Sequence, residues 1–421
     1  MVINRALKIR IYPNKEQEQF ILKNLGCCRF IYNQMLAEHK FVYEQLKNDK
    51  LTLYKYKYKT EKEYKQEFEW LKDADAVALQ QSRMDLSIAY QNFFKRLKKK
   101  VNSTQLGFPK FHKRGVKDSY RSINNGGIFI DFNLKKVKLP KISWIKFRDP
   151  RIIDDINIKS ATISKTKTGK YFVSLLYEKE IFPKQINLTK PNLKTKGLDM
   201  SLANLFVDEQ GSSPEYKRLF RTYEPKLSKL QQVVSRRQLG SNRRKKAQLR
   251  VNKVYEKITN TRKDFNSKLS RHLVNNNDVI VVEDLNLQAM AQSLKLGKSV
   301  NDLGYGQFRF MLKYKAQEAG KVFIEANKWF ASSKTCHVCG FIKKDLALSE
   351  RDWVCSSCGE HHHRDTNAAI NLADYGLKEI GQGMPKFTLV DIKALASEAI
   401  VNNADDVELG GRNENIDLHI I

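Results

Sequence analysis

Residues 196–207 read Lys-Gly-Leu-Asp-Met-Ser-Leu-Ala-Asn-Leu-Phe-Val, an apolar stretch that one acid, Asp199, interrupts. A short apolar run predicts a buried strand, and this run continues past the acid into what we expect to be another strand. A lone aspartate inside a strand is costly to bury, because its charged form loses hydration unless a partner replaces the water. The stretch therefore predicts a β-sheet with a carboxylate in need of a partner.

Two further acids occupy similar settings far along the chain. Glu283 ends an apolar run that begins at Val279, and Asp365 precedes residues 366–372, where we expect a helix to begin. Three carboxylates at strand ends and a helix start can share divalent ions, with two Mg²⁺ activating a water and stabilising the leaving oxygen of a phosphodiester. Taken singly, each acid has a structural alternative: Asp365 can cap a helix. From spacing alone, Asp284 is as good a ligand as Glu283.

Four cysteines form two tight pairs. Cys336 and Cys339 are followed by Gly340, Cys355 and Cys358 are followed by Gly359, and fifteen residues separate the pairs. Two such knuckles place four thiolates at tetrahedral corners, which predicts a structural Zn²⁺ with no open coordination position. We expect the nearby histidines to be spare rather than ligands, and Cys27 and Cys28 to be buried in a helix. Those histidines are His337, His361, His362 and His363.

The charge of the chain points to a polyanionic partner. The 421 residues carry a net charge of +30, and such a surface repels itself unless it binds a polyanion such as nucleic acid. Residues 217–271 hold 18 lysines and arginines against three acids. Their apolar spacing predicts two helices broken near Gly240, with a basic face along a phosphate backbone; a merely solvated face is the alternative. The candidate contacts are Arg236, Arg237, Arg243, Arg244, Lys245 and Lys246.

The first half of the chain predicts strands on both sides of a helical block. Residues 5–12 alternate as a half-buried strand, and Asn14 with Gln17 can form a capping box that starts the helices. Short strands follow residue 107, including a hairpin across Thr168 and Gly169. We expect one small barrel interrupted by helices, with a boundary to the second half near residue 190. In the helical block, Gln80 and Gln81 can touch duplex DNA, although ordinary surface glutamines are the alternative.

Several classes of protein are excluded by composition. No apolar stretch is long enough to span a membrane, and the first residues lack the apolar core of a signal peptide. Six cysteines are too few for a disulfide scaffold of this length. We therefore expect a reduced, intracellular protein. After Lys386 the charge becomes acidic, which predicts a partly disordered tail.

Several of these segments together resemble the transposon-encoded TnpB nucleases. They are Gly-Leu-Asp199, the basic helical pair, Val-Glu283-Asp-Leu-Asn, the first cysteine knuckle with the Ser-Ser-Lys-Thr before it, and Arg-Asp365-Thr-Asn-Ala-Ala-Ile-Asn-Leu. The likeness is strong over residues 193–376 and weaker over the opening Arg10-Ile-Tyr-Pro-Asn14, Arg29-Phe-Ile-Tyr-Asn33 and residues 79–94. It implies that the metal-binding acids are Asp199, Glu283 and Asp365, and so favours Glu283 over Asp284.

The resemblance also implies an α/β multidomain fold. Its parts are a wedge β-barrel (1–12 and 108–190), a helical recognition domain (13–107), a RuvC or RNase H-like nuclease domain (191–331 and 361–386), a zinc-ribbon insert (332–360) and the acidic tail (387–421). The insert is expected to act as a lid that binds target nucleic acid. The expected setting is the cytoplasm of a prokaryote.

For function, the resemblance implies an RNA-guided, metal-dependent DNA endonuclease. A guide RNA would pair with one strand of double-stranded target DNA, while the protein reads a short adjacent duplex motif. Two alternatives share the fold: a small type V CRISPR effector with a guide from a repeat array, and a nuclease-derived repressor that binds without cutting. Three intact acids disfavour the repressor. An unguided resolvase is disfavoured because about 190 residues precede the nuclease core.

Overall fold

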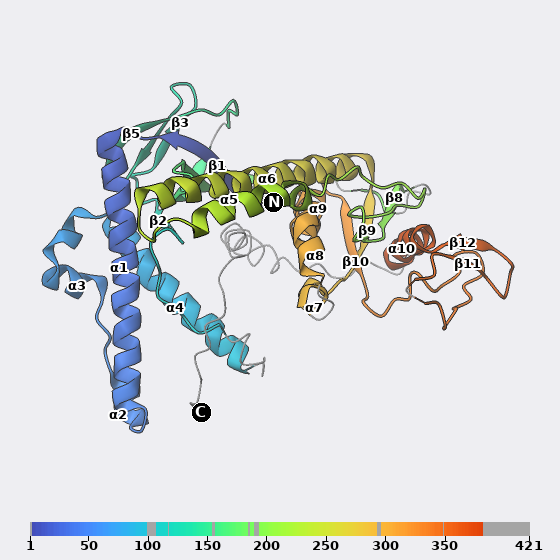
Figure 1. Ribbon diagram of the computed structural model, residues 1–421, viewed down its shortest axis with the longest axis horizontal. Helices are drawn as coiled ribbons and strands as arrows, with labels where there is room; N and C mark the ends of the chain where they lie inside the picture. The colour runs from blue at the N-terminus through green and yellow to red at the C-terminus, as the bar shows by residue number, and fades with distance from the viewer. Residues whose placement is uncertain are drawn as a thin grey trace. The chain divides into compact units, whose positions relative to one another are not determined.

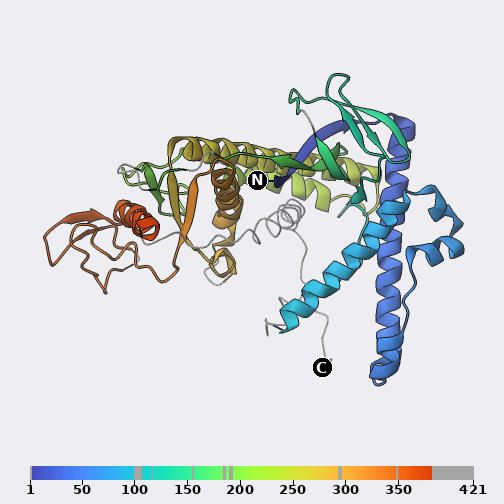
Figure 2. The ribbon, with the colours of Figure 1, turned by 180° about the vertical axis from the view of Figure 1, so that it is seen from behind.

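The structure is a computed structural model that describes residues 2–98, 107–116, 118–153, 156–183, 186–188, 193–292, 296–347 and 349–381. The chain divides into two compact units, with the division between Glu180 and Ile181. Most of the stretch around residue 190, where the sequence places the boundary, lies outside the described residues, as does the acidic tail. Figures 1 and 2 show the elements from opposite sides.

The first unit contains a seven-stranded antiparallel sheet in the order β2-β6-β7-β1-β5-β4-β3. Its first strand, β1 (Val2–Tyr12), pairs with β7 along nearly its whole length, with Leu7 opposite Leu175 and Ile9 opposite Val173. The opening strand therefore joins the later strands, as the sequence predicts. The other strands are β2 (Ser119–Ile123), β3 (Phe129–Asp131), β4 (Lys136–Leu139), β5 (Ile142–Phe147), β6 (Asn157–Lys165) and β7 (Tyr171–Glu180).

A helical block lies between β1 and β2 in the chain. It begins with the predicted capping box: the N–H of Gln17 donates to Asn14 Oδ1 at 2.8 Å, and the Gln17 side chain accepts from the N–H of Asn14 at 3.0 Å. Cys27 and Cys28 are buried in the first helix. The helices are α1 (Lys15–Leu46), α2 (Lys50–Lys55), α3 (Glu61–Glu67) and α4 (Ala76–Lys98), with a 3₁₀ turn at Glu69–Asp73.

The second unit is built on a three-stranded parallel sheet in the order β10-β9-β8. Its strands are β8 (Thr195–Leu198), β9 (Val279–Glu283) and β10 (Val322–Ala326). The strand expected beyond Asp199 is reduced, within the described region, to one antiparallel bridge between Asp199 and Val207. The helices are α5 (Leu219–Ser235), α6 (Asn242–Asn276), α7 (Leu287–Gln292), α8 (Gly297–Leu303), α9 (Tyr305–Glu318) and α10 (Arg364–Gly381).

Helix α10 lies directly against the backbone of the sheet (Figure 1). A Cβ on Gly197 of β8 would lie 2.0 Å from the carbonyl oxygen of Ala369, and a Cβ on Gly376 would lie 2.4 Å from Val281 Cγ2. Both values are far below van der Waals contact, so a glycine is needed on the strand and another on the helix. This close approach sets where the first turn of α10, and with it Asp365, sits relative to the strand ends.

We predict that Gly376→Ala destabilises the second unit by about 1–3 kcal/mol, because the new methyl group overpacks the contact between α10 and β9. The matched control is Gly381→Ala on the same helix, where a Cβ would meet nothing within 4 Å. That control should be neutral or slightly stabilising, since alanine is the better helix former. Differential scanning calorimetry of the full chain measures both, and equal effects would contradict the packing argument.

Candidate active site

Asp199 and Glu283 lie next to each other at the carboxyl ends of neighbouring parallel strands. The register pairs Leu198 of β8 with Val282 of β9, so the following residues on the two strands are Asp199 and Glu283. Asp199 is fixed by two backbone hydrogen bonds to Val207, at 3.0 Å and 2.8 Å. Ligand sites commonly form at this edge of an open parallel sheet.

The third acid, Asp365, lies in the first turn of α10. Because α10 packs on β8 and β9, its first turn brings Asp365 toward the other two carboxylates. The electrostatics show the proximity: burial, followed by the negative charges of Glu283 and Asp365, raises the pKa of Asp199 well above its ordinary value. The structure thus brings together three acids that are 84 and 82 positions apart in the sequence.

The pKa of Glu283 is raised as well. Burial raises its pKa, and the negative charge of Asp365 adds to the rise, while the Ser332 hydroxyl and the positive charge of Arg364 oppose it. Ser332 Oγ donates to Glu283 Oε1 at 2.6 Å. Both Glu283 and Asp199 are only half-buried, so solvent and ions can reach them. Ionising all three carboxyl groups in this place therefore costs free energy.

The acids suit hard divalent ions such as Mg²⁺. Carboxylate oxygens are the ligands that Mg²⁺ prefers, and an excess of partly desolvated negative charge favours a bound cation. Among the described residues, one set of three or more His, Cys, Asp or Glu side chains could hold a metal ion, and it consists of the four cysteines. Their sulfur atoms all lie within 4.8 Å of one another. The three acids are not part of that set, and their mutual influence is seen in the raised pKa of Asp199.

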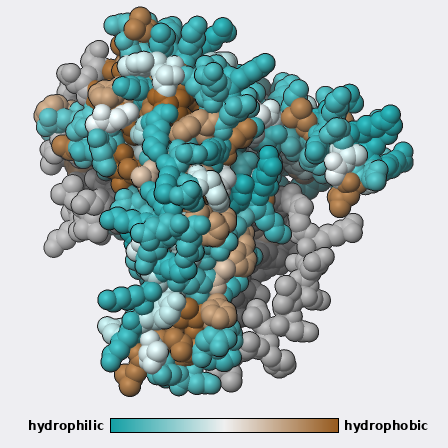
Figure 3. Space-filling view, turned by 90° about the vertical axis from the view of Figure 1, so that its left-hand side faces the viewer, coloured by the Kyte–Doolittle hydropathy of each residue, from teal (hydrophilic) through white to brown (hydrophobic). Residues whose placement is uncertain are grey.

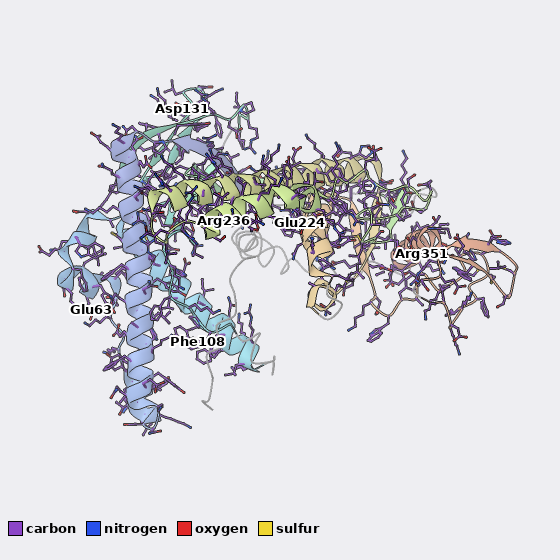
Figure 4. The ribbon with its side chains drawn as sticks, viewed as in Figure 1. Glu63, Phe108, Asp131, Glu224, Arg236 and Arg351 are labelled. Atoms are coloured by element: carbon purple, nitrogen blue, oxygen red, sulfur yellow. The ribbon has the colours of Figure 1, made fainter. Side chains whose placement is uncertain are left out.

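An arginine that the sequence analysis missed contacts this group. Arg351 Nη1 donates to Asp365 Oδ1 at 2.7 Å, and the N–H of Arg364 donates to the Arg351 carbonyl at 2.7 Å. Arg351 lies just before β11 (Asp352–Val354), outside the sheet that carries the other acids (Figure 4). Its place in a charged run, Ser-Glu-Arg-Asp, gave no sign that it would meet an acid 14 positions away.

The alternative ligand Asp284 points to a different environment. Its side chain is more than half exposed and pairs with Arg309 Nη1 at 3.3 Å. Glu283, by contrast, is half-buried beside Asp365 and hydrogen-bonded to Ser332. The geometry therefore places Glu283 with the other two acids.

The four cysteines form the predicted pair of knuckles. The Sγ atoms of Cys336 and Cys358 are 3.6 Å apart, and those of Cys339 and Cys355 are also 3.6 Å apart. Zn–S bonds of about 2.3 Å in a tetrahedron require sulfur atoms about 3.8 Å apart, so the cluster fits a structural Zn²⁺. The site is closed by four thiols.

The two knuckles have matching backbone hydrogen bonds. In the first, the N–H of Cys336 donates to the Phe341 carbonyl and the N–H of Gly340 donates to the Cys336 carbonyl, at 2.8 Å and 2.9 Å. In the second, Cys355 and Gly359 repeat the pattern with the same two distances. Both glycines have positive φ, 75° and 77°, a conformation that favours glycine at these turns.

One of the four histidines contacts the cluster. His361–His363 form β12, which pairs with β11. His362 is buried and its Nε2 lies 3.1 Å from Cys336 Sγ, a hydrogen-bond contact to one thiol. His337 Nδ1 lies 3.0 Å from Asn367 Oδ1, so this ring nitrogen is directed toward α10. Four sulfur atoms already complete a tetrahedral site, which leaves these rings in supporting positions.

The basic hairpin of α5 and α6 forms as the sequence predicts. Ser241 caps α6, and its side chain accepts from the N–H of Arg244 at 3.2 Å. The side chain of Arg244 donates to the carbonyls of Val234 and Arg237, at 2.8 Å and 3.0 Å, so it closes the turn between the helices. The other candidate cations are exposed: Arg236 (labelled in Figure 4), Arg237, Arg243, Lys245 and Lys246.

Several of these cations stand at an electrostatically unfavourable place. The first turn of α6 contains no acid, and positive charge near a helix N-terminus opposes the helix dipole by about 0.3–1 kcal/mol per residue. Phosphate groups bound there would remove this cost. Figure 3 shows the side of the molecule that lies on the left in Figure 1, where hydrophilic residues predominate and apolar residues form scattered patches.

The two candidate glutamines of α4 differ in exposure. Gln80 is exposed, whereas Gln81 is 2% exposed and directs its amide to Met84 Sδ. Of the two, only Gln80 has an exposed side chain, because α4 packs the Gln81 side chain into the first unit. In the part of the chain that the structure describes, no helix is long and apolar enough to cross a membrane.

Three family models match the chain. A model described as "Cas12f1-like, TNB domain" matches residues 305–372, one described as "Probable transposase" matches residues 174–294, and a "Helix-turn-helix domain" matches residues 1–48. In the structure, residues 2–46 form β1 and one long helix rather than a helix-turn-helix.

Curated relatives and a solved structure agree with these matches. The chain is 32% identical over 387 residues to a "Putative RNA-guided DNA endonuclease" of Streptomyces pristinaespiralis, covering 89% of this chain and 90% of the relative. It is 28% identical to InsQ of Escherichia coli K12, which has the same description, covering 88% and 92%. The Cas12f1–sgRNA–target DNA complex matches with a TM-score of 0.55 at 13% identity, covering 88% and 99%, which shows likeness of fold alone.

The raised pKa of Asp199 predicts that the protein becomes less stable as the pH rises. Because the folded state binds this proton more tightly than the unfolded chain, the free energy of unfolding falls as pH rises from about 4 through the folded pKa. Asp199→Asn should therefore raise the unfolding temperature in Mg²⁺-free buffer at about pH 7.5, with a difference that shrinks toward about pH 4. Asp264→Asn on the exposed face of α6 is the control. An Asp199→Asn protein that is less stable than the parent at the higher pH would contradict the account.

Replacing one cysteine should empty the zinc site. We expect Cys336→Ser to lower zinc content from about one ion per chain to nearly none, and to unfold the insert, because zinc affinity is folding energy in such sites. Cys27→Ser, in the other unit, should leave zinc content unchanged. Plasma mass spectrometry of the purified proteins measures this, and a Cys336→Ser protein with full zinc would refute the ligand assignment.

Proposed function

Because the chain belongs to the TnpB family of RNA-guided DNA endonucleases, we propose that Asp199, Glu283 and Asp365 form the centre that hydrolyses target DNA. The observation that carries this proposal is the placement of the acids: Asp199 and Glu283 follow paired residues at the ends of two parallel strands, and burial together with the charges of Glu283 and Asp365 raises the pKa of Asp199. Three carboxylates at one edge of a sheet form a binding site for divalent cations next to a polyanionic substrate.

Each part of this centre has a separate task. Asp199 and Glu283 offer carboxylate oxygens from rigid strands, and Asp365 offers its oxygens from the first turn of α10. Bound Mg²⁺, as a pair, would supply an activated water and charge stabilisation at the leaving oxygen. Arg351 and Arg364 lie beside the acids and place positive charge where a scissile phosphate would approach.

Sequence choice belongs to the guide RNA. Base pairing with the target strand supplies specificity, so the protein mainly needs cations for phosphates and a few side chains for a short adjacent duplex motif. We assign the phosphate contacts to the exposed cations of the α5–α6 hairpin and a motif contact to Gln80. Such contacts make binding strongly salt-dependent.

The domain scheme of the family fits the two units. We propose that the seven-stranded sheet is the wedge barrel: β2 and β3 end the sheet order, yet residues 124–128 connect them directly, so the two edges lie close together. Helices α1–α4 would form the recognition domain, and the parallel sheet with its helices the RuvC-like domain. The zinc ribbon would be the lid that binds target nucleic acid. We place the protein in the cytoplasm of a prokaryotic cell.

Neighbouring acids at the end of β9 give a matched test. Glu283→Gln should lower the rate of guide-directed DNA cleavage by on the order of 10³-fold, as expected for about 4 kcal/mol of lost metal-dependent stabilisation. Asp284→Asn should cut nearly as fast as the parent, because that side chain faces Arg309. Cleavage of a guide-matched plasmid with Mg²⁺ or with EDTA measures both.

The binding steps provide the control for this test. Asp199→Ala and Glu283→Gln should retain RNA and DNA binding in gel-shift assays, since neither residue lies in the basic hairpin. The proposal would be overturned by loss of RNA binding in Asp199→Ala, or by equal cleavage defects in Glu283→Gln and Asp284→Asn.

A further inference from the structure

The segment between β10 and the first zinc knuckle contacts both metal sites. Ser332 is buried, and its hydroxyl donates to Glu283 Oε1 at 2.6 Å. Four residues later the same segment supplies Cys336, the first thiol of the zinc cluster. A hydrogen bond to an ionised carboxylate is about twice as strong as a neutral one, so Ser332 can fix the rotamer of Glu283.

Two asparagines of α10 hold this segment in place. Asn371 Nδ2 donates to the carbonyls of Ser332 and Thr335, at 2.8 Å and 2.6 Å. One turn earlier, Asn367 Nδ2 donates to the Thr335 carbonyl at 2.8 Å, and Asn367 Oδ1 accepts from the N–H of His337 at 3.2 Å. Asn367 and Asn371 are both buried, so their amides satisfy backbone groups that water does not reach.

Helix α10 therefore fixes two of the three acids. It carries Asp365 in its own first turn, and it orients Glu283 through Asn371 and Ser332. The zinc cluster anchors the other end of the five-residue segment from Ser332 to Cys336. A change in the zinc ribbon can reach the serine along this segment, whose Thr335 and His337 are bonded to the same helix face as Ser332.

We propose that Ser332, held by Asn367 and Asn371, is the positioning residue for Glu283, and that the zinc ribbon is thereby part of the scaffold of the catalytic metal centre. The inference rests on the proposed function of the three acids and adds a task to the ribbon besides binding target nucleic acid. It follows that loss of zinc weakens divalent-metal binding at the acids, although the two sites share no ligand.

The chain contains its own matched control, the adjacent Ser333. Its side chain is half-buried and makes no hydrogen bond within the described residues. Removing an outer hydrogen bond to a metal-binding carboxylate typically costs 10–100-fold in metal affinity, so Ser332→Ala should weaken Mn²⁺ binding by about tenfold or more. Ser333→Ala should bind Mn²⁺ as the parent does, and Ser332→Thr, which keeps the hydroxyl, should recover most of the affinity.

The experiment is a Mn²⁺ titration of the full zinc-loaded protein with its RNA, followed by electron paramagnetic resonance. Asp199→Ala measures the ions bound elsewhere, above all on RNA, and zinc content is measured in every sample. A parent that binds no more Mn²⁺ than Asp199→Ala would overturn the three-acid centre itself. A parent that exceeds Asp199→Ala, with Ser332→Ala equal to Ser333→Ala, would overturn the positioning role alone.

A second measurement covers the case in which Ser332→Ala loses its zinc. Zinc is then removed from the parent protein with a thiol reagent, and the same titration is repeated. We expect Mn²⁺ affinity at the acids to fall by a similar factor, whereas full affinity in the zinc-free parent would overturn the coupling between the ribbon and Glu283.

Discussion

The close approach of α10 to the parallel sheet is the contact on which the candidate active site depends. Gly197 on β8 and Gly376 on α10 leave room for backbone and side chains that any Cβ would displace. Because the helix lies this near, its first turn reaches the carboxyl ends of β8 and β9, where two acids already stand. The basic hairpin and the four-cysteine knuckles lie in the same unit, but this contact is what brings the three carboxylates toward one another.

The three gathered carboxylates destabilise the folded protein when they are ionised. Burial and mutual repulsion raise the pKa of Asp199, and burial raises that of Glu283, so ionising these carboxyl groups in the folded protein costs free energy. Arg351, Arg364 and Ser332 offset part of it. Strained or repulsive groups of this kind are commonly retained where a ligand relieves them, and here divalent cations would do so.

Much of this could be predicted from the sequence, because the signals are local. The capping box at Asn14, the break at Gly240 and the spacing of the cysteines each depend on a few adjacent residues. The resemblance, rather than spacing, selected Glu283 over Asp284. The contacts of Arg351 and Ser332 could not be predicted, since they join residues that are distant in sequence and depend on tertiary packing. The burial of Gln81 was missed because a polar residue beside an apolar helix face gives no sign of its own that it packs inward. Asn367 and Asn371 had a visible signal, two amides one turn apart on an otherwise apolar helix face.

The most direct test is to locate the ions. Crystals of the full chain with its RNA, grown with Mn²⁺ and measured at the manganese absorption edge, would show where divalent metal binds. Our account predicts anomalous density between the carboxylates of Asp199, Glu283 and Asp365, separate from the zinc signal at the four cysteines. Manganese bound only elsewhere, with these acids paired to arginine alone, would contradict it.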